Sequence, residues 1–165
     1  MQEMVGRMKK MHLKHTGRLQ LGLFLKGCGF SVEDSLRWWQ SQFTRDMTAE
    51  KFLKTYAYMF RHMHGKEGKR TDYTPYSCGK IISAPSPGGD EVHGCPYKTW
   101  DPTRLRARLA MAGVEQPHLD QVVQLAKDRH FQLACRKEFE ARHGTVTDDV
   151  GEHPNSYYAE SRKCS

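Results

Sequence analysis

The stretch His64-Gly-Lys-Glu-Gly-Lys-Arg-Thr-Asp-Tyr-Thr-Pro-Tyr-Ser-Cys78 opens a part of the chain that differs in character from the rest. On either side of residues 64–100, apolar residues recur with the spacing of amphipathic helices. Within that segment Gly, Pro, Ser, Lys and Asp dominate without a period, and residues 83–90 are rich in turn formers. A long irregular segment in a compact domain is usually functional or is ordered by something other than secondary structure. The sequence therefore predicts a mostly α-helical fold with one irregular, loop-rich insert at about 64–100.

Helical periodicity precedes this insert. Apolar residues repeat with helical spacing in four segments, residues 1–11, 19–25, 32–43 and 48–63. Gly17 is expected to separate the first helix from the second. Ser31-Val-Glu-Asp34 resembles a capping box, in which two side chains satisfy the first free amides of a helix. It therefore predicts the start of the third helix.

Helical signals return after the insert. Asp101-Pro102 is an N-cap followed by proline at the first helical position, and this helix is expected to end at Gly113. A single long helix is then predicted from about Pro117 to His143. Gly144 is its expected C-cap, and the tail beyond it is predicted to be loop-like.

The composition describes a basic chain of ordinary domain size. Its 165 residues suit one domain, so we expect residues 1–165 to form a single domain. Lys and Arg number 26 against 19 Asp and Glu, which gives a formal charge of +7. This excess favours a polyanionic partner, either nucleic acid or an acidic membrane face, although it also serves solubility. No apolar run reaches the roughly 20 residues that cross a bilayer, and no signal peptide is evident.

The five cysteines are odd in number and include no Cys-x-x-Cys pair, which suits a reducing compartment rather than a disulfide framework. Cys78 and Cys95 bound the turn-rich part of the insert, and Cys135 falls on the long helix. Three interpretations stay open at this point. The thiols are buried and free, they bind zinc together with His93 or His130, or four thiolates bind an iron–sulfur cluster.

Cations and aromatic residues are interleaved in the first part of the chain. Cations neutralise phosphates and rings stack on unpaired bases, so the mixture favours single strands or strand ends. The candidates are Lys14, His15, Arg18, Lys26, Trp38, Trp39, Tyr56, Tyr58, Arg61, His62, Lys66, Lys69 and Arg70. A plainer interpretation stands beside each of them. Trp39 and Tyr56 lie on apolar faces and suit a core, whereas the cations suit a solvated surface.

The sequence offers no catalytic site. The run Gly65-Lys-Glu-Gly-Lys-Arg70 lacks the spacing of a nucleotide-binding P-loop, and no apolar strand precedes it. No carboxylate set suits a two-metal polymerase, and no serine lies in a nucleophile elbow. We therefore expect no chemistry from this chain itself, although the amides and cations of the run suit a terminal phosphate.

Segments spread over nearly the whole chain carry a resemblance to one known family. They are Leu13-Lys-His15, Gly17-Arg18, Gly22 to Gly27, Arg61-His62, Gly65 to Cys78, His93 to Pro96, Ala134-Cys135 and His153-Pro-Asn155. The chain resembles the C-terminal iron–sulfur domain of the large subunit of eukaryotic/archaeal-type DNA primase. The resemblance implies a mostly α-helical fold whose insert is organised around a buried [4Fe–4S] cluster.

The resemblance also implies a function. It is that of a non-catalytic domain that binds the primer 5′-triphosphate end and the template single strand during RNA primer synthesis for the initiation of DNA replication. The implied partners are the DNA template, the RNA primer, the catalytic small subunit of primase and DNA polymerase alpha. The implied location is the nucleus, with no membrane involved.

Site residues can be carried over by position. The family's basic set falls on Lys14, His15, Arg18 and Lys26, and its aromatic set falls on Trp39, Tyr56 and Tyr58. For Trp39 and Tyr56, the resemblance therefore favours a place on the binding surface over a place in the core. Lys14 stands where an arginine is common, so a bidentate phosphate contact is expected to be weaker there.

The cluster ligands are carried over incompletely. The family uses four cysteines, and three of them match Cys78, Cys95 and Cys135. The fourth lies just upstream of the segment that aligns with Met1, so we expect this chain to lack its N-terminal cysteine segment and its cluster to be incomplete or absent. Cys164, or less well Cys28, is the expected substitute.

Functions from two other classes stay open. One is a zinc- or cluster-stabilised interaction module whose basic face binds an acidic protein partner. The other is a redox or flavin enzyme with a helical core, for which the sequence offers no dinucleotide-binding fingerprint.

Overall fold

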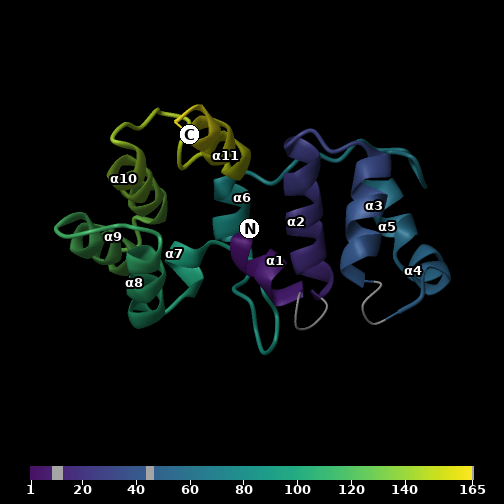
Figure 1. Cartoon of the computed structure of the whole chain (residues 1–165), viewed down its shortest axis with the longest axis horizontal. Helices are drawn as coiled ribbons and strands as arrows, with labels where there is room; N and C mark the ends of the chain where they lie inside the picture. The colour runs from purple at the N-terminus through teal and green to yellow at the C-terminus, as the bar shows by residue number, and fades with distance from the viewer. Residues whose placement is uncertain (9–12, 44–46, 165) are drawn as a thin grey trace. The chain divides into compact units, whose positions relative to one another are not determined.

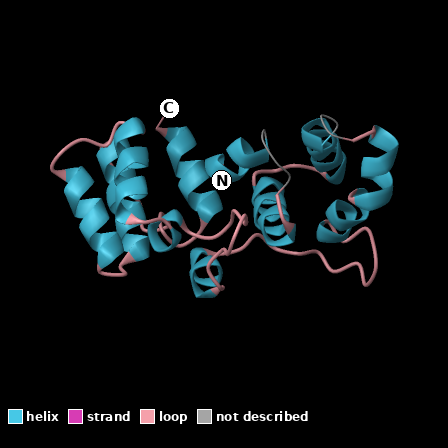
Figure 2. Cartoon of the chain, turned by 90° about the horizontal axis from the view of Figure 1, so that it is seen from below, coloured by secondary structure: helices cyan, strands magenta, loops and turns pink. Residues whose placement is uncertain are grey.

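The computed structural model describes residues 1–8, 13–43 and 47–164. Helices joined by loops make up this part of the chain, and no strand occurs in it (Figures 1 and 2). The helical fold class is thereby confirmed. The chain divides into two compact units, the first formed by Met1–Pro75 with Gly88–His93 and the second by Tyr76–Pro87 with the chain from Gly94 onward. None of the helices within the described ranges is long and apolar enough to cross a membrane.

The first unit is built from five helices of the described chain. They are α1 (Gln2–Met8), α2 (His15–Gly27), α3 (Val32–Phe43), α4 (Ala49–Thr55) and α5 (Ala57–Met63). Helices α3, α4 and α5 pack on one another, and α2 packs against α3 and α5 (Figure 1). Their shared core is aromatic, because Trp39, Phe43, Phe52 and Phe60 are all buried there. Ring centroids in this group lie 4.5 to 6.1 Å apart, within the range of favourable aromatic pairs.

Local capping sets two of these helix starts. The Asp34 amide donates to the Ser31 hydroxyl at 3.0 Å and the Ser31 amide donates to the Asp34 carboxylate at 3.2 Å, so the expected capping box is present. The Thr48 hydroxyl caps α4 by accepting from the Lys51 amide. The single helix expected over 48–63 is divided into α4 and α5 at Tyr56, which caps both helices and has a φ of −119°.

Gly17 does not break a helix, contrary to the expectation from the sequence. It is the third residue of α2 and is buried. A Cβ at this position would lie 2.6 Å from the Val92 carbonyl oxygen, closer than any real side chain approaches. Glycine is therefore needed for the close approach of the 88–93 segment to α2 rather than for a turn.

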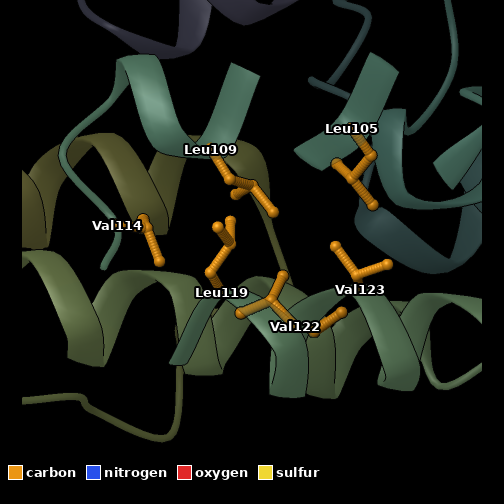
Figure 3. Close-up of a cluster of buried hydrophobic side chains, with 7 residues drawn as sticks. Leu105, Leu109, Val114, Leu119, Val122 and Val123 are labelled. Carbon is orange, nitrogen blue, oxygen red and sulfur yellow. The ribbon is translucent and has the colours of Figure 1, made fainter. Parts of the chain in front are cut away.

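The second unit contains the remaining helices of the described chain. They are α6 (Cys78–Ser83), α7 (Pro96–Thr99), α8 (Pro102–Met111), α9 (His118–Lys127), α10 (Phe131–His143) and α11 (Pro154–Lys163). Leu105 and Leu109 of α8 point toward Leu119, Val122 and Val123 of α9, and Val114 closes this aliphatic core (Figure 3). The insert at 64–100 is irregular apart from the short helices α6 and α7.

Two expectations for the C-terminal part were wrong in detail. The long helix is interrupted between α9 and α10, where Arg129 adopts a left-handed φ of 65° and the His130 amide donates to the Leu125 carbonyl. This is the bonding of a helix C-cap that glycine usually provides. The tail is not loop-like, because α11 begins at Pro154 behind His153, whose ring nitrogen accepts from the Asn155 amide at 3.1 Å. By contrast, Asp101 caps α8 and Gly144 ends α10 as expected.

Candidate nucleic-acid interface and metal centre

A basic loop, defined as residues 64–73, follows α5 in the first unit. Its base is closed by an antiparallel bridge between His64 and Asp72. The Lys26 ammonium donates to the Met63 carbonyl at 3.0 Å, the Asp72 carboxylate at 2.5 Å and the Tyr73 carbonyl at 2.6 Å. These oxygens lie at both ends of the loop, and Lys26 lies in the last turn of α2. The side chain of Lys26 therefore ties both ends of the loop to α2.

Three aromatic rings form a row beside this loop. The Tyr58 and His62 rings are 5.9 Å apart and inclined by 28°, and the His62 and Tyr73 rings are 5.1 Å apart and inclined by 33°. Tyr58 is 52% exposed and Tyr73 is 41% exposed. The loop packs against the row at Gly68, where a Cβ would lie 3.4 Å from the Tyr58 hydroxyl and the His62 ring. We call Tyr58, His62 and Tyr73 the ring row.

The loop carries the cations that the sequence singled out. Lys66, Lys69 and Arg70 are exposed, so their charges face solvent beside the ring row. Arg61 is different, because its guanidinium is paired with Glu67 at 2.7 Å. The arrangement brings stacking surfaces and phosphate-neutralising charges onto one part of the unit, which suits a single strand or a strand end.

The cations at the start of α2 have defined neighbours. The Lys14 ammonium lies 3.3 Å from the Asp90 carboxylate, and His15 is exposed. Arg18 donates to the Leu13 carbonyl and lies over the Tyr56 ring, 5.1 Å from its centroid. Burial lowers the pKa of Arg18, with the Tyr56 hydroxyl acting in the opposite direction. Its Nε is buried and has no hydrogen-bond partner within the described ranges.

Trp39 does not lie on a binding surface, and the placement taken from the family resemblance is wrong. Its side chain is 0% exposed and its ring stacks on Phe60 with centroids 4.5 Å apart. Trp38 is partly exposed and meets the Trp39 ring edge-on. Tyr56 is intermediate, since one face is covered by Phe43 at 4.5 Å while the side chain as a whole is only partly buried.

The three cysteines of the expected metal site belong to the second unit. Cys78 is the first residue of α6, Cys95 is the N-cap of α7, and Cys135 lies on α10. None forms a disulfide. Burial, followed by the charge of Cys95, raises the pKa of Cys78 to about 12. Burial, Glu138, Cys78 and Cys95 raise the pKa of Cys135, so the three thiols are near enough for their charges to interact.

The donor chemistry of this cysteine cluster suits a thiophilic metal or an iron–sulfur cluster, since buried thiols with interacting charges become ligands once deprotonated. Burial also raises the pKa of Cys95, and amides of Lys98 and Tyr97 oppose this effect. In the described ranges, no group of three or more His, Cys, Asp or Glu side chains is arranged to coordinate a metal ion. Cys164 is exposed at the end of α11, and the His93 Nε2 atom lies 3.5 Å from the Glu91 carboxylate.

A buried polar network next to these thiols was missed by sequence reasoning. Glu138 is 5% exposed and accepts hydrogen bonds from the Tyr157 hydroxyl at 2.7 Å, Arg142 at 3.1 Å and the Tyr97 hydroxyl at 3.5 Å. Burial, followed by the charge of Cys135, raises the pKa of Tyr97. The tyrosines come from α7 and α11 and the acid from α10, so no local pattern could have indicated this contact.

Comparison with known proteins identifies the family. A family model that describes the C-terminal domain of the large subunit of eukaryotic and archaeal DNA primase matches residues 1–158, which run through both units. The chain belongs to this family. The resemblance stated from the sequence motifs is therefore confirmed.

Individual relatives of this primase family agree. The chain is 49% identical over 152 residues to the "Probable DNA primase large subunit" of Arabidopsis thaliana, covering 92% of this chain and 33% of that protein. It is 44% identical over 156 residues to the Homo sapiens DNA primase large subunit, covering 92% and 30%. The Saccharomyces cerevisiae protein is 41% identical over 169 residues, covering 97% and 32%. The chain thus spans about a third of the length of the curated relatives that it matches.

Proposed function

We propose that this domain binds the 5′-triphosphate end of an RNA primer and the adjoining single-stranded template, without performing chemistry itself. The observation that carries the proposal is the ring row, with Tyr58 and Tyr73 exposed, next to a loop with three exposed cations in a member of the primase large-subunit family. These cations are Lys66, Lys69 and Arg70. Rings supply stacking, of about 1–3 kcal/mol per base, and cations neutralise phosphate. The proposal includes the catalytic small subunit and DNA polymerase alpha as partners in the nucleus.

A binding measurement tests this function. A fluorescein-labelled DNA template annealed to a short RNA primer is titrated with the domain, once with a 5′-triphosphate and once with a 5′-hydroxyl on the primer. We expect weaker binding to the hydroxyl form. Equal affinity for the two probes would contradict end recognition, and binding to neither would leave the acidic-protein interaction module as the better hypothesis.

Salt dependence separates phosphate contacts from other surface charge. Removing one phosphate contact with a single strand should reduce the slope of log affinity against log salt by about 0.7. We expect this change for Lys69→Met, because Lys69 is exposed on the basic loop. Lys127→Met, in the second unit and away from the basic loop in sequence, is the matched control and should leave the slope unchanged.

We also propose that Cys78, Cys95 and Cys135 are three ligands of a [4Fe–4S] cluster. Their burial, their interacting charges and the chemistry of thiolate ligands support this assignment. When bound, such a cluster supplies a cross-link between α6, α7 and α10 and a one-electron redox centre. Cys78, Cys95 and Cys135 of the second unit are thus the three proposed ligands. Cys164, in the same unit, is a candidate for the fourth ligand.

Metal analysis tests the cofactor proposal. Iron and acid-labile sulfide are measured after anaerobic purification of the domain, with and without upstream sequence of the primase large subunit. We expect Cys135→Ser to lose both, and Cys28→Ser to lose neither. Zinc without sulfide in the wild-type protein would contradict the cluster and favour a zinc site.

A further inference from the structure

The ammonium of Lys26 has no hydrogen left for a phosphate. A lysine ammonium has three N–H donors, and here Met63, Asp72 and Tyr73 oxygens accept all three at 3.0, 2.5 and 2.6 Å. The side chain is 16% exposed. Its charge is balanced by the Asp72 carboxylate, so a nucleic-acid phosphate would have to displace a bonded anion to reach it.

The acceptors show what the ammonium does in this fold. Met63 ends α5, immediately before the basic loop, whereas Asp72 and Tyr73 end the loop. The His64–Asp72 bridge and a 3.0 Å contact between the Ser35 hydroxyl and the His64 ring fix the same base of the loop. Lys26 therefore joins the two ends of the loop to α2 and adds to the contacts that fix its base.

This closure has a consequence for the ring row. The backbone carbonyl of Tyr73 accepts a hydrogen bond from the Lys26 ammonium. This bond therefore fixes the backbone position from which the Tyr73 ring extends. That ring lies 5.1 Å from His62 and is 41% exposed, which leaves part of it available for stacking. Loss of the bond should therefore loosen the end of the loop and displace the Tyr73 ring from the row.

We propose that Lys26 is a positioning residue for nucleic-acid recognition, and that Tyr73 is the contact residue that it positions for stacking on an unpaired base. The proposal rests on the proposed function, because it names how the same surface is assembled. It replaces the sequence-based expectation that Lys26 itself contacts phosphate. The two roles predict opposite effects for one substitution, Asp72→Asn.

The first arm of the test needs no nucleic acid. Amide hydrogen exchange of residues 64–72 is measured in the free domain. We expect Lys26→Met and Asp72→Asn each to speed exchange about tenfold, as loss of a charge-assisted hydrogen bond implies. Lys26→Arg should restore slower exchange because it keeps the donors. Lys69→Met, which removes an exposed charge from the same loop, should change nothing. Unchanged exchange in both Lys26→Met and Asp72→Asn would overturn the positioning role.

The second arm uses the triphosphate primer annealed to a single-stranded DNA template. If Lys26 positions the loop, Asp72→Asn weakens binding about three- to tenfold, even though it removes a negative charge. If Lys26 contacts phosphate, the same change frees the ammonium, and equal or tighter binding overturns the proposal. Tyr73→Phe should bind as the wild type does, whereas Tyr73→Leu should lose about tenfold or more, because only the ring stacks.

The two arms distinguish the inference from the function on which it rests. A wild-type domain that binds neither the triphosphate probe nor its hydroxyl counterpart would overturn the proposed function and the contact role of Tyr73. The exchange result would still decide whether Lys26 closes the loop. Equal affinity of Tyr73→Leu and wild type would overturn Tyr73 as a contact, whatever the exchange result.

Discussion

The ring of Trp39 stacks on the ring of Phe60, with centroids 4.5 Å apart and planes inclined by 20°. Both side chains are buried, so the pair belongs to the core of the first unit. Trp39→Ala should therefore lower the free energy of unfolding by about 3–5 kcal/mol, as large cavities in aromatic cores do. Denaturant unfolding followed by far-UV circular dichroism measures the loss.

A milder pair of variants separates this core role from base stacking. Trp39→Phe should cost less stability and leave primer–template affinity unchanged, while Leu53→Ala, at an exposed position of α4, should change the free energy of unfolding by less than about 0.5 kcal/mol. Weaker nucleic-acid binding by a stable, folded Trp39→Phe domain would show that Trp39 takes part in binding.

Gly17 is required by close packing, and its replacement should destabilise the first unit. In Gly17→Ala the new methyl group would lie 2.6 Å from the Val92 carbonyl oxygen, so backbone must move. We expect a loss of about 1–3 kcal/mol of unfolding free energy, the usual range for overpacking. Gly6→Ala in α1 is the control, because no described atom lies within 4 Å of its Cβ position. An equal effect of the two changes would show that helix propensity, not packing, decides.

Acid should open the basic loop. The Lys26 hydrogen bond, and then its charge, lowers the pKa of Asp72 from its ordinary value of 3.8, and His64 and Lys66 act in the same direction. A lowered carboxyl pKa contributes stability that is complete above the unfolded value and is lost as the pH falls through the folded one. Loop closure should therefore weaken progressively below about pH 3.8.

NMR chemical shifts of loop amides between about pH 5 and pH 2 measure this opening, with α3 amides as the control for global unfolding. The acid transition of the loop should be absent in Asp72→Asn, which lacks the titrating carboxyl. An identical transition in that variant would assign it to another group.

Glu138 holds the polar network of the second unit, so its removal should be more damaging than that of any one partner. Glu138→Ala removes the acceptor of two tyrosine hydroxyls and leaves Arg142 with only its bond to the Tyr157 hydroxyl, which should cost about 2–4 kcal/mol. Tyr97→Phe removes the longest of the three bonds and should cost about 1 kcal/mol or less. Thermal unfolding measures the loss of stability in both variants. Equal losses would contradict the central role of the Glu138 carboxylate in this network.

The sequence predicted those helix boundaries that local chemistry sets. The Ser31–Asp34 capping box, the Asp101 cap and the Gly144 C-cap are all contained within a few residues of chain, and each is found in the structure. The break at Arg129 could not be predicted in the same way, because an arginine there adopts a conformation that usually requires glycine. The helix behind His153 was missed because an imidazole is an uncommon cap.

The candidate site was predicted in its residue types but not in its assembly. Tyr58, His62 and the exposed cations of the loop were identified from composition and periodicity, because those signals report residue chemistry. The ring of Tyr73 and the three bonds of Lys26 depend on which distant segments meet, which periodicity does not encode. Trp39 is the opposite case. Its position on an apolar helix face correctly indicated burial, but the family resemblance, which implied a surface position, was given more weight.

The amide of Cys78 donates to the carbonyl of Glu152 at 2.9 Å, which joins the start of α6 to the segment just before α11. The two residues lie far apart in sequence, so the contact forms late, after a long loop has closed. During synthesis, Cys78 therefore leaves the ribosome well before the backbone that fixes its position. A cofactor delivered to these thiols would therefore meet their final arrangement only after the segment just before α11 has been synthesised.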